Sequence, residues 1–193
     1  FLEPDPYGQG SAYMVNSLYL DTWEWDLAMM TVEGLKNRFK LRARCYDFEG
    51  ASPVFLENKG RVGTSIVKSR AKIDRAQATD ILLGNLPPES GYTAIDSKSQ
   101  DQVTQFRDRM DFLDLRPTLW VRYLREAWVS CVGDGSRLTF DYALQFQHPI
   151  EGSPMNPEPT QWVDVDLVPN IILEMKFNGA SPKWMANIVN MLG

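Results

Sequence analysis

Hydrophobic and polar residues alternate along seven short segments of the chain, which is typical of β-strands with one buried face. The alternation predicts strands at 13–21, 38–46, 54–59, 65–70, 118–129, 137–147 and 171–177. Gly60 and Gly63 lie between the third and fourth segments, so we expect these two to form a hairpin. The chain therefore contains a sheet of mostly antiparallel strands.

The period changes to that of a helix between the fourth and fifth segments. Asp74 can cap a helix that runs to Leu83 and ends at Gly84. A second apolar stripe at helical spacing follows at Val103, Phe106, Met110 and Leu113, and a last helix begins near Pro182. The segments 87–99 and 149–159 are predicted as loops. With 193 residues, 44% of them hydrophobic, the chain is predicted to form one α+β domain.

The polar positions of three strands are almost all cationic. Every second residue is charged in Arg38, Lys40, Arg42 and Arg44, in Glu57, Lys59 and Arg61, and in Lys68 and Arg70. These side chains line one face of the sheet, whereas the intervening apolar ones pack on the other. A single such strand fits the wet face of an exposed sheet, but several strands with the same sign do not, because a wet face mixes signs.

The overall charge makes this pattern more informative. The net charge is -5, yet eleven of the twenty Lys and Arg residues lie in alternating strand segments. Nucleic-acid binders show a basic domain or stripe instead. An internal cationic surface in an acidic protein suits a compact anion that is taken in, so we expect a polyanion partner and no nucleic acid.

Other features limit the cell compartment and the chemistry. No segment approaches the roughly 20 apolar residues of a membrane helix, and the first ten residues are not a signal peptide. Cys45 and Cys131 lack metal-ligand spacing, so we expect free thiols and a cytoplasmic location. His148 precedes a proline near a loop and receives no role.

Four carboxylates share the phase of the strand cations: Asp21, Glu57, Asp141 and Glu174. Such acids can pair with cations or hold a divalent metal that accompanies a phosphate. We favour ion pairs for Glu57 beside Lys59 and for Asp141 near Arg137, since buried charges are normally paired. Glu174 has the strongest case as a metal ligand.

Six runs of the chain resemble, in order and spacing, one known family. They are YMVNSLYLDT (13–22), RFKLRARCY (38–46), FLENKGRVGTSIVKSR (55–70), PTLWVRYLREAW (117–128), RLTFDYAL (137–144) and ILEMKFNGASPKW (171–184). Together they resemble the VTC domain of polyphosphate polymerases, within the triphosphate tunnel metalloenzyme or CYTH-like superfamily. The resemblance implies an antiparallel β-barrel whose tunnel is lined by Lys, Arg and a few Glu, with helices packed outside.

The resemblance also implies a chemistry and a set of residues. The γ-phosphoryl group of ATP would pass to a polyphosphate chain, with Mn²⁺ or Mg²⁺ as the cofactor. By motif, Glu174 would hold the metal, Tyr123 would donate a hydroxyl to a phosphate oxygen, and Arg122 would lie outside the tunnel because it is out of phase. The phosphates would be held by a catalytic set of Arg42, Arg44, Lys59, Arg125 and Arg137 and by Lys40, Arg61, Lys68 and Lys176.

The chain departs from the family pattern at both ends. Members begin with a further strand before the segment at Tyr13 and continue beyond the helix at Trp184, so we expect 1–193 to be a single tunnel domain without its first strand and its C-terminal helix. A missing strand leaves unpaired backbone edges, and we expect impaired activity of this fragment. A tunnel triphosphatase and a non-catalytic polyphosphate-binding module remain as alternatives.

Overall fold

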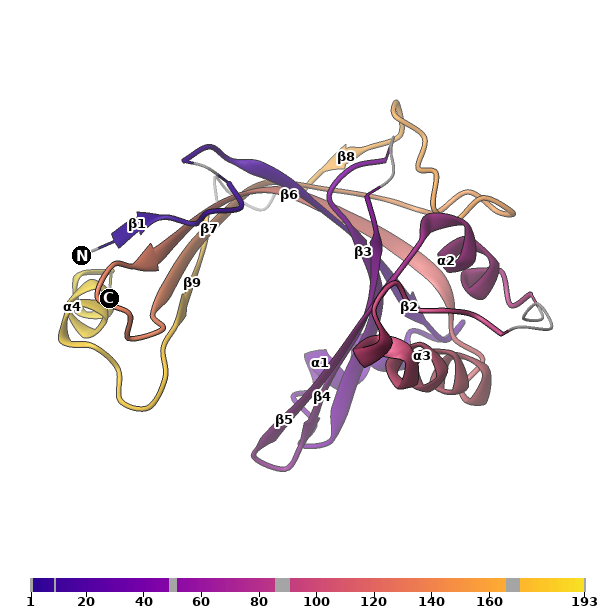
Figure 1. The fold of residues 1–193 in the computed structure, drawn as a ribbon, viewed down its shortest axis with the longest axis horizontal. Coiled ribbons are helices and arrows are strands. Elements are labelled where there is room, and N and C mark those ends of the chain that lie inside the picture. Colours follow the sequence, from indigo (N-terminus) through magenta and orange to yellow (C-terminus); the bar gives the residue numbers. More distant parts are fainter. Residues whose placement is uncertain (1, 9, 49–51, 86–90, 166–170, 193) are drawn as a thin grey trace. The chain divides into compact units, whose positions relative to one another are not determined.

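The computed structural model describes residues 2–8, 10–48, 52–85, 91–165 and 171–192 and shows an α+β fold (Figure 1). The strands are β1 (Leu2–Pro4), β2 (Tyr13–Asp21), β3 (Arg38–Cys45), β4 (Val54–Val62), β5 (Ser65–Ile73), β6 (Arg116–Ser130), β7 (Arg137–Gln147), β8 (Val163–Asp164) and β9 (Ile172–Lys176). The helices are α1 (Asp26–Val32), α2 (Arg75–Leu82), α3 (Gln100–Phe112) and α4 (Lys183–Leu192), with a short 3₁₀ turn at Ser97–Ser99.

The strands form an antiparallel sheet in the order β5-β4-β3-β2-β6-β7-β8, while β1 pairs with β6 and β9 pairs with β7. This confirms the predicted antiparallel α+β class. In the described part of the chain, β5 and β8 end the hydrogen-bonded path without pairing with each other. Closure into a barrel therefore stays a prediction.

The chain divides into two compact units. Unit 1 contains Phe1–Met14, Tyr123–Leu144 and Asp164–Gly193, and unit 2 contains Val15–Arg122 and Gln145–Val163. Strands β6 and β7 each contribute one part to each unit. The two units are described separately below.

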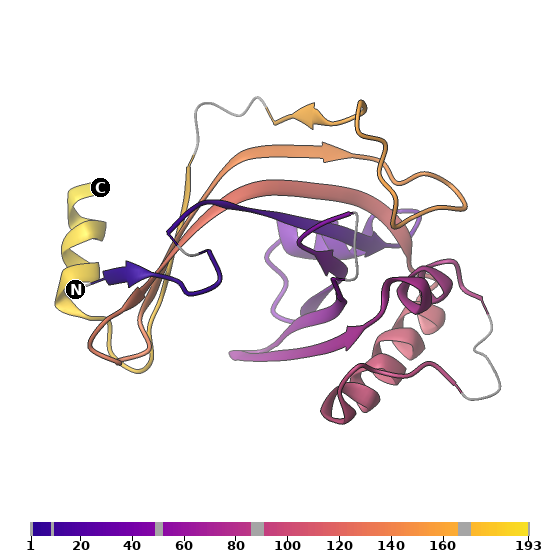
Figure 2. The ribbon, with the colours of Figure 1, turned by 45° about the horizontal axis from the view of Figure 1, so that its top comes forward.

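Unit 2 holds the main hydrophobic core. Alternate apolar residues of β3, β4 and β5, away from the hairpin turn, are buried on one face of the sheet, and α2 and α3 pack against that face, as Figures 1 and 2 show. The core includes Leu41, Ala43, Leu56, Ala71 and Ile73 from the strands and Ala78, Ile81, Val103, Phe106 and Met110 from the helices. The alternation of the sequence thus separates an apolar face under helices from the charged face.

The ends of α2 follow the sequence signals. The Asp74 carboxylate accepts a hydrogen bond from the backbone N–H of Gln77 at 2.9 Å, and the Gln77 side chain donates to the same carboxylate. This arrangement satisfies N–H groups that a helix start leaves without partners. Gly84 follows the helix with a φ of 70°, a left-handed conformation that suits glycine.

The hairpin between β4 and β5 corrects one prediction. Gly60 does not lie in the turn but within β4, opposite Val67, and pairing continues to Val62 and Ser65. Gly63 and Thr64 form the two-residue turn, and the φ of 60° at Gly63 suits a hairpin of this length. The hairpin is therefore longer than the alternation predicted, and its cationic face is longer too.

Helix α1 was not predicted from the sequence. The Asp21 carboxylate accepts hydrogen bonds from the N–H groups of Leu27 at 2.8 Å and Ala28 at 3.0 Å. Negative charge at a helix N-terminus is stabilising. Asp21, one of the four in-phase carboxylates, therefore stabilises the N-terminus of α1.

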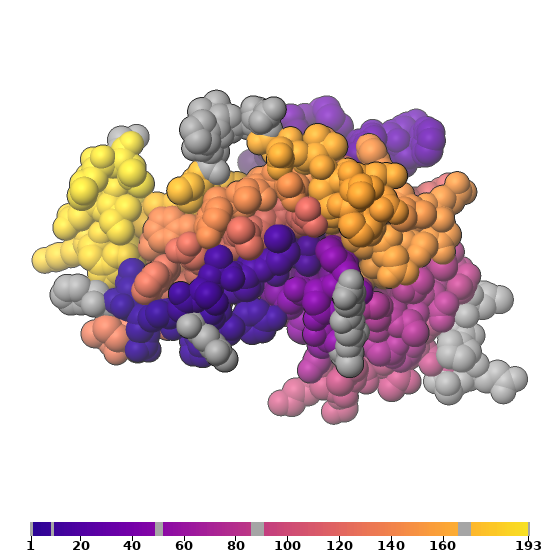
Figure 3. Space-filling model, turned by 90° about the horizontal axis from the view of Figure 1, so that it is seen from above, coloured from indigo at the N-terminus to yellow at the C-terminus, as the bar shows by residue number. Residues whose placement is uncertain are grey.

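The loop between β7 and β8 closes the other side of the unit 2 core. The indole Nε1 of buried Trp120 donates to the carbonyl of Pro154 at 3.0 Å, and Met155 is fully buried. Trp162 lies against Phe48, with ring centroids 6.2 Å apart. This segment forms the orange surface in Figure 3. The predicted loop is thus an ordered cover of the core.

Unit 1 is built on the hairpin ends of β6 and β7. Pro4 of β1 lies opposite Trp128 of β6, and Glu174 of β9 lies opposite Thr139 of β7. Helix α4 starts as predicted, with the N–H groups of Met185 and Ala186 donating to the carbonyl of Pro182. Strand β1 was not predicted, because three residues are too few to show a period.

Candidate functional site

The charged face of β3, β4 and β5 is organised in rows across the strands. The three central rows place Arg44, Phe55 and Lys72 together, then Arg42, Glu57 and Arg70, then Lys40, Lys59 and Lys68. The row nearest the turn pairs Arg38 with Arg61. Residues directly opposite one another share a face, so these rows form one surface in unit 2, which we name the cationic face.

Like charges lie directly opposite each other on this face. Lys59 lies between Lys40 and Lys68, and within the rows given above the only carboxylate is Glu57. Like charges in opposite positions destabilise a sheet. A bound anion would offset this repulsion, and among the described residues these rows supply only one carboxylate, Glu57.

Glu57 is the centre of an arginine cluster. Its side chain is 13% exposed, and its carboxylate lies 2.7 Å from Nε of Arg42, 3.7 Å from Nε of Arg44 and 3.3 Å from Nε of Arg70. The predicted ion pairing of Glu57 is confirmed, but its partners are arginines and no Lys59 pair is found in the described structure. One carboxylate faces three guanidinium groups, so this cluster keeps an excess of positive charge.

Two aromatic residues complete the arginine cluster. Nη1 of Arg42 donates to the Tyr19 hydroxyl at 3.0 Å, and the guanidinium of Arg70 lies 3.7 Å from the ring centroid of Phe55. Burial acts to lower the pKa of Arg42, but Tyr19 and Glu57 outweigh it and raise the pKa. Arg42 is therefore a permanent cation.

Unit 1 contains a second cluster with a different charge balance. Arg125 forms a two-pronged bond with Asp141, from Nε at 2.6 Å and from Nη2 at 2.7 Å. Burial acts to lower the pKa of Arg125, but the hydrogen bonds to Asp141, with Tyr123 and Glu174 nearby, raise it. The predicted partner of Asp141 was wrong: Arg137 instead lies 2.8 Å from Asp5.

Glu174 lies at the edge of the unit 1 cluster. Its Oε2 is 3.1 Å from Nζ of Lys176 and 3.8 Å from Nη2 of Arg125. Directly opposite it, the buried hydroxyl of Thr139 has no hydrogen-bond partner among the described residues. The described residues contain no group of three His, Cys, Asp or Glu side chains that could hold a metal. Glu174 can thus supply one carboxylate to a divalent cation whose other ligands are phosphate oxygens and water, as Mg²⁺ accepts.

The structure groups the predicted site residues into two sets. Arg42, Arg44, Lys59, Lys40, Arg61 and Lys68 share the cationic face of unit 2, whereas Arg125, Arg137, Tyr123, Lys176 and Glu174 belong to unit 1. Arg122 lies apart from both sets: its guanidinium is 3.9 Å from the Trp162 ring centroid and donates to Gln145.

Several residues of these clusters, among them Arg70, Tyr19, Phe55 and Asp5, were not among the predicted site residues. Arg70 lies two residues after Lys68, and Tyr19 lies at an alternating position of the predicted strand 13–21. The sequence therefore contained a signal for both residues. Asp5 carried none, because its partner Arg137 is distant in the chain.

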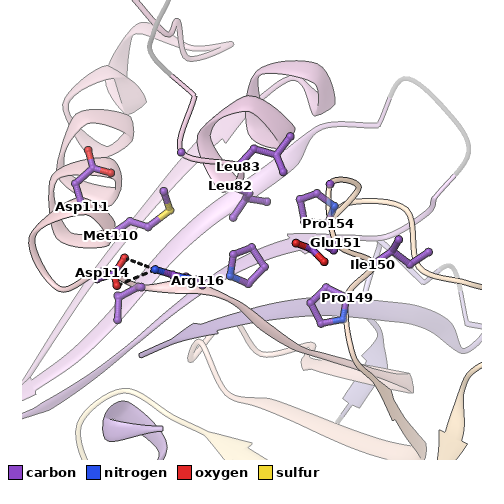
Figure 4. A pocket seen from close by; sticks show the side chains of 14 residues that line it. Leu82, Leu83, Met110, Asp111, Asp114, Arg116, Pro149, Ile150, Glu151 and Pro154 are labelled. Atoms are coloured by element: carbon purple, nitrogen blue, oxygen red, sulfur yellow. Dashed lines mark hydrogen bonds and ion pairs between the residues drawn. The ribbon is translucent and has the colours of Figure 1, made fainter. Parts of the chain in front are cut away.

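Unit 2 also contains a pocket of about 630 Å³ that shares no residue with the cationic face. It lies between α2, α3 and the loop after β7, as Figure 4 shows. Its charged residues are Asp111, Asp114, Glu151 and Arg116, and Arg116 is paired with Asp114 at 3.0 Å. Its acidic lining does not suit a phosphate, so the cationic face is the better candidate for an anion.

Comparison with known proteins identifies the family. No curated protein matches the chain. None of the described helices has both the length and the apolar character that crossing a membrane requires. The family model described as the VTC domain matches residues 2–192. The match covers almost the whole chain, which therefore belongs to the VTC domain family.

Proposed function

We propose that this chain is the catalytic domain of an ATP-dependent polyphosphate polymerase. Membership of the VTC domain family supports a polyphosphate-related function. The observation that carries the proposal is the cationic face, where Glu57 is the single carboxylate in the described rows of lysines and arginines. A linear polyphosphate supplies that anion, with one negative charge on each repeating unit. The ATP requirement also favours a cytoplasmic location.

The reaction needs no covalent intermediate with the protein. A terminal oxygen of the polyphosphate attacks the γ-phosphorus of ATP, the bond from that phosphorus to the β,γ-bridging oxygen breaks, and ADP leaves. Such transfer is catalysed mainly by positioning and by neutralising charge. Arginine supplies two-pronged donors and lysine a point charge, and the proposed site contains both kinds.

Each set of residues has a role in this proposal. Arg42, Arg44 and Lys59 would hold phosphates on the cationic face, with Lys40, Arg61 and Lys68 along the same face. Arg125 and Arg137 would hold phosphates in unit 1, supported by Tyr123 and Lys176. The tunnel that the family resemblance implies would enclose the polyphosphate.

Glu174 is the proposed ligand of Mn²⁺ or Mg²⁺. The fit rests on a half-buried carboxylate and on the Thr139 oxygen opposite it, which has no partner in the described part of the chain; both are hard donors. A bound divalent cation would neutralise phosphate charge. Lys176 and Arg125 already contact Glu174, so these residues would keep the carboxylate in place when phosphate arrives.

Two alternatives share these residues. A tunnel triphosphatase would release free phosphate, and a binding module would retain polyphosphate without turnover. The ion pairs of Glu174 with Lys176 and Arg125 are the observation that favours the binding module, because a paired carboxylate has a structural role without a metal.

The test is an assay of the full-length protein that contains this chain, incubated with ATP and Mn²⁺. We expect a ladder of polyphosphate on a gel together with ADP. Free phosphate without polymer would support the triphosphatase. The absence of both products, together with tight binding of polyphosphate, would support the binding module.

A further inference from the structure

The three arginines around Glu57 present the same nitrogen to it. Arg42, Arg44 and Arg70 each approach the carboxylate through Nε, at distances between 2.7 and 3.7 Å. The Nε edge of each guanidinium therefore faces the Glu57 carboxylate, although the Arg70 side chain is 48% exposed. The terminal Nη groups are left at the outer end of each side chain.

Few protein groups engage these terminal nitrogens. Nη1 of Arg42 donates to Tyr19, and within the described residues no bond to the Nη atoms of Arg44 or Arg70 is found. The guanidinium of Arg70 lies over the ring of Phe55. Nε of Arg42 donates to Glu57, whereas Arg44 and Arg70 lie within ion-pair distance of the carboxylate, and the buried Nε of Arg44 has no hydrogen-bond partner among the described residues. Guanidinium groups gathered around one carboxylate in this way can offer their remaining N–H donors to a tetrahedral oxyanion.

We propose that Glu57 is a positioning residue that holds Arg42, Arg44 and Arg70 as one clamp for a phosphate group of the bound polyanion. This inference rests on the proposed function, because it names the phosphate as the ligand. Glu57 does not touch the phosphate in this account. It acts through the three side chains that it orients.

Simple electrostatics predicts the opposite effect of Glu57. A carboxylate on an anion-binding face repels the anion, so its removal should strengthen binding. Positioning predicts weaker binding after its removal, because three guanidinium groups would repel one another and lose their common orientation. The sign of the change therefore separates the two roles.

The experiment measures binding of inorganic tripolyphosphate, without metal, by calorimetry. We expect Glu57→Gln to weaken binding about tenfold, the size of one lost charge-assisted hydrogen bond. Glu57→Asp keeps the charge on a shorter side chain and should fall between wild type and Glu57→Gln. If Glu57 acted only by repelling the anion, Glu57→Gln would bind tripolyphosphate more tightly than wild type and Glu57→Asp.

Asp114→Asn is the matched control. It changes the net charge by the same amount, and Asp114 is exposed, lies outside the cationic face and has a φ of 49° that Asn tolerates. We expect its tripolyphosphate affinity to equal that of wild type. The urea midpoint of each variant shows whether the variant is folded. If Glu57→Gln is unfolded, the comparison of Glu57→Asp with wild type tests the inference.

Two results would overturn the inference: unchanged or tighter binding by folded Glu57→Gln, or no binding of tripolyphosphate by wild type. The proposed function fails separately. If wild type binds tripolyphosphate and Glu57→Gln weakens it, but ATP yields no polymer, the clamp stands and the polymerase does not.

Discussion

At the scale of single residues, the two clusters differ in how much positive charge they leave for a ligand. Glu57 faces Arg42, Arg44 and Arg70, so its cluster carries excess positive charge. In unit 1, by contrast, Asp141 takes both prongs of Arg125. We therefore expect the cationic face to bind a phosphate chain without a metal ion. In unit 1, we expect Glu174 to bind a divalent cation together with the phosphate.

Replacing Glu174 with Gln tests the metal role. The amide is nearly the same size as the carboxylate but binds divalent cations poorly, so we expect polymer formation to fall about a hundredfold, within the range found for groups that stabilise developing charge. Binding of polyphosphate without metal should persist. Initial rates with ATP and Mn²⁺, together with metal-free calorimetry, provide both readouts. Unchanged turnover would remove the metal role.

The buried thiol of Cys45 makes stability depend on pH. Burial raises the pKa of Cys45 to about 11, although Arg75 acts to lower it. The unfolded thiol ionises near its ordinary pKa of about 8.5. Between these values the unfolded state loses a proton that the folded state keeps, so stability falls as pH rises through this interval.

Urea unfolding measured across that interval checks this expectation. The free energy of unfolding of Cys45→Ala should fall less steeply than that of wild type. Cys131→Ala is the control, because Cys131 is exposed and should leave the slope unchanged. Equal slopes in all three proteins would show that Cys45 does not contribute.

At the scale of elements, the N-terminal cap of α2 is the clearest local determinant. Asp74→Ala removes the acceptor for the Gln77 N–H, and we expect a loss of about 1 kcal/mol in the free energy of unfolding. Asp108→Ala, at an exposed position of α3, is the matched control and should cost nothing comparable. Similar losses in both variants would mean that the cap has no specific effect.

The sequence predicted most elements because their signals are local. Alternation gave β2 and β7 with the observed bounds, and the stripe at Val103, Phe106 and Met110 gave α3. Helix α1 depends on the Asp21 carboxylate that precedes it, and the turn at Gly63 depends on pairing with β5. Such signals become visible only when strands and helices are placed together.

For the candidate site, the local pattern was predicted from the sequence, whereas contacts between distant residues were not. The period of two put the arginines and lysines of β3, β4 and β5 on one face, as the rows confirm. The partners of the acids were predicted less well: Asp141 binds Arg125, and Arg137 binds Asp5. Register across strands decides such pairs, and a single sequence does not contain it.

At the scale of the whole molecule, charge is distributed unevenly. The chain carries a net charge of -5, yet lysines and arginines are concentrated on the rows of β3, β4 and β5. A negative net charge limits nonspecific binding of nucleic acids, while a local cationic surface attracts a compact polyanion. This distribution agrees with membership of the VTC domain family.

The most direct test of the account follows the label from ATP into product. The full-length protein is incubated with Mn²⁺ and ATP labelled at either the γ- or the α-phosphate, and the products are separated before and after treatment with a polyphosphate-degrading enzyme. We expect γ-label to enter a long polymer that is sensitive to that enzyme, and α-label to stay in ADP. Label released only as free phosphate, or retained entirely in ATP, would contradict it.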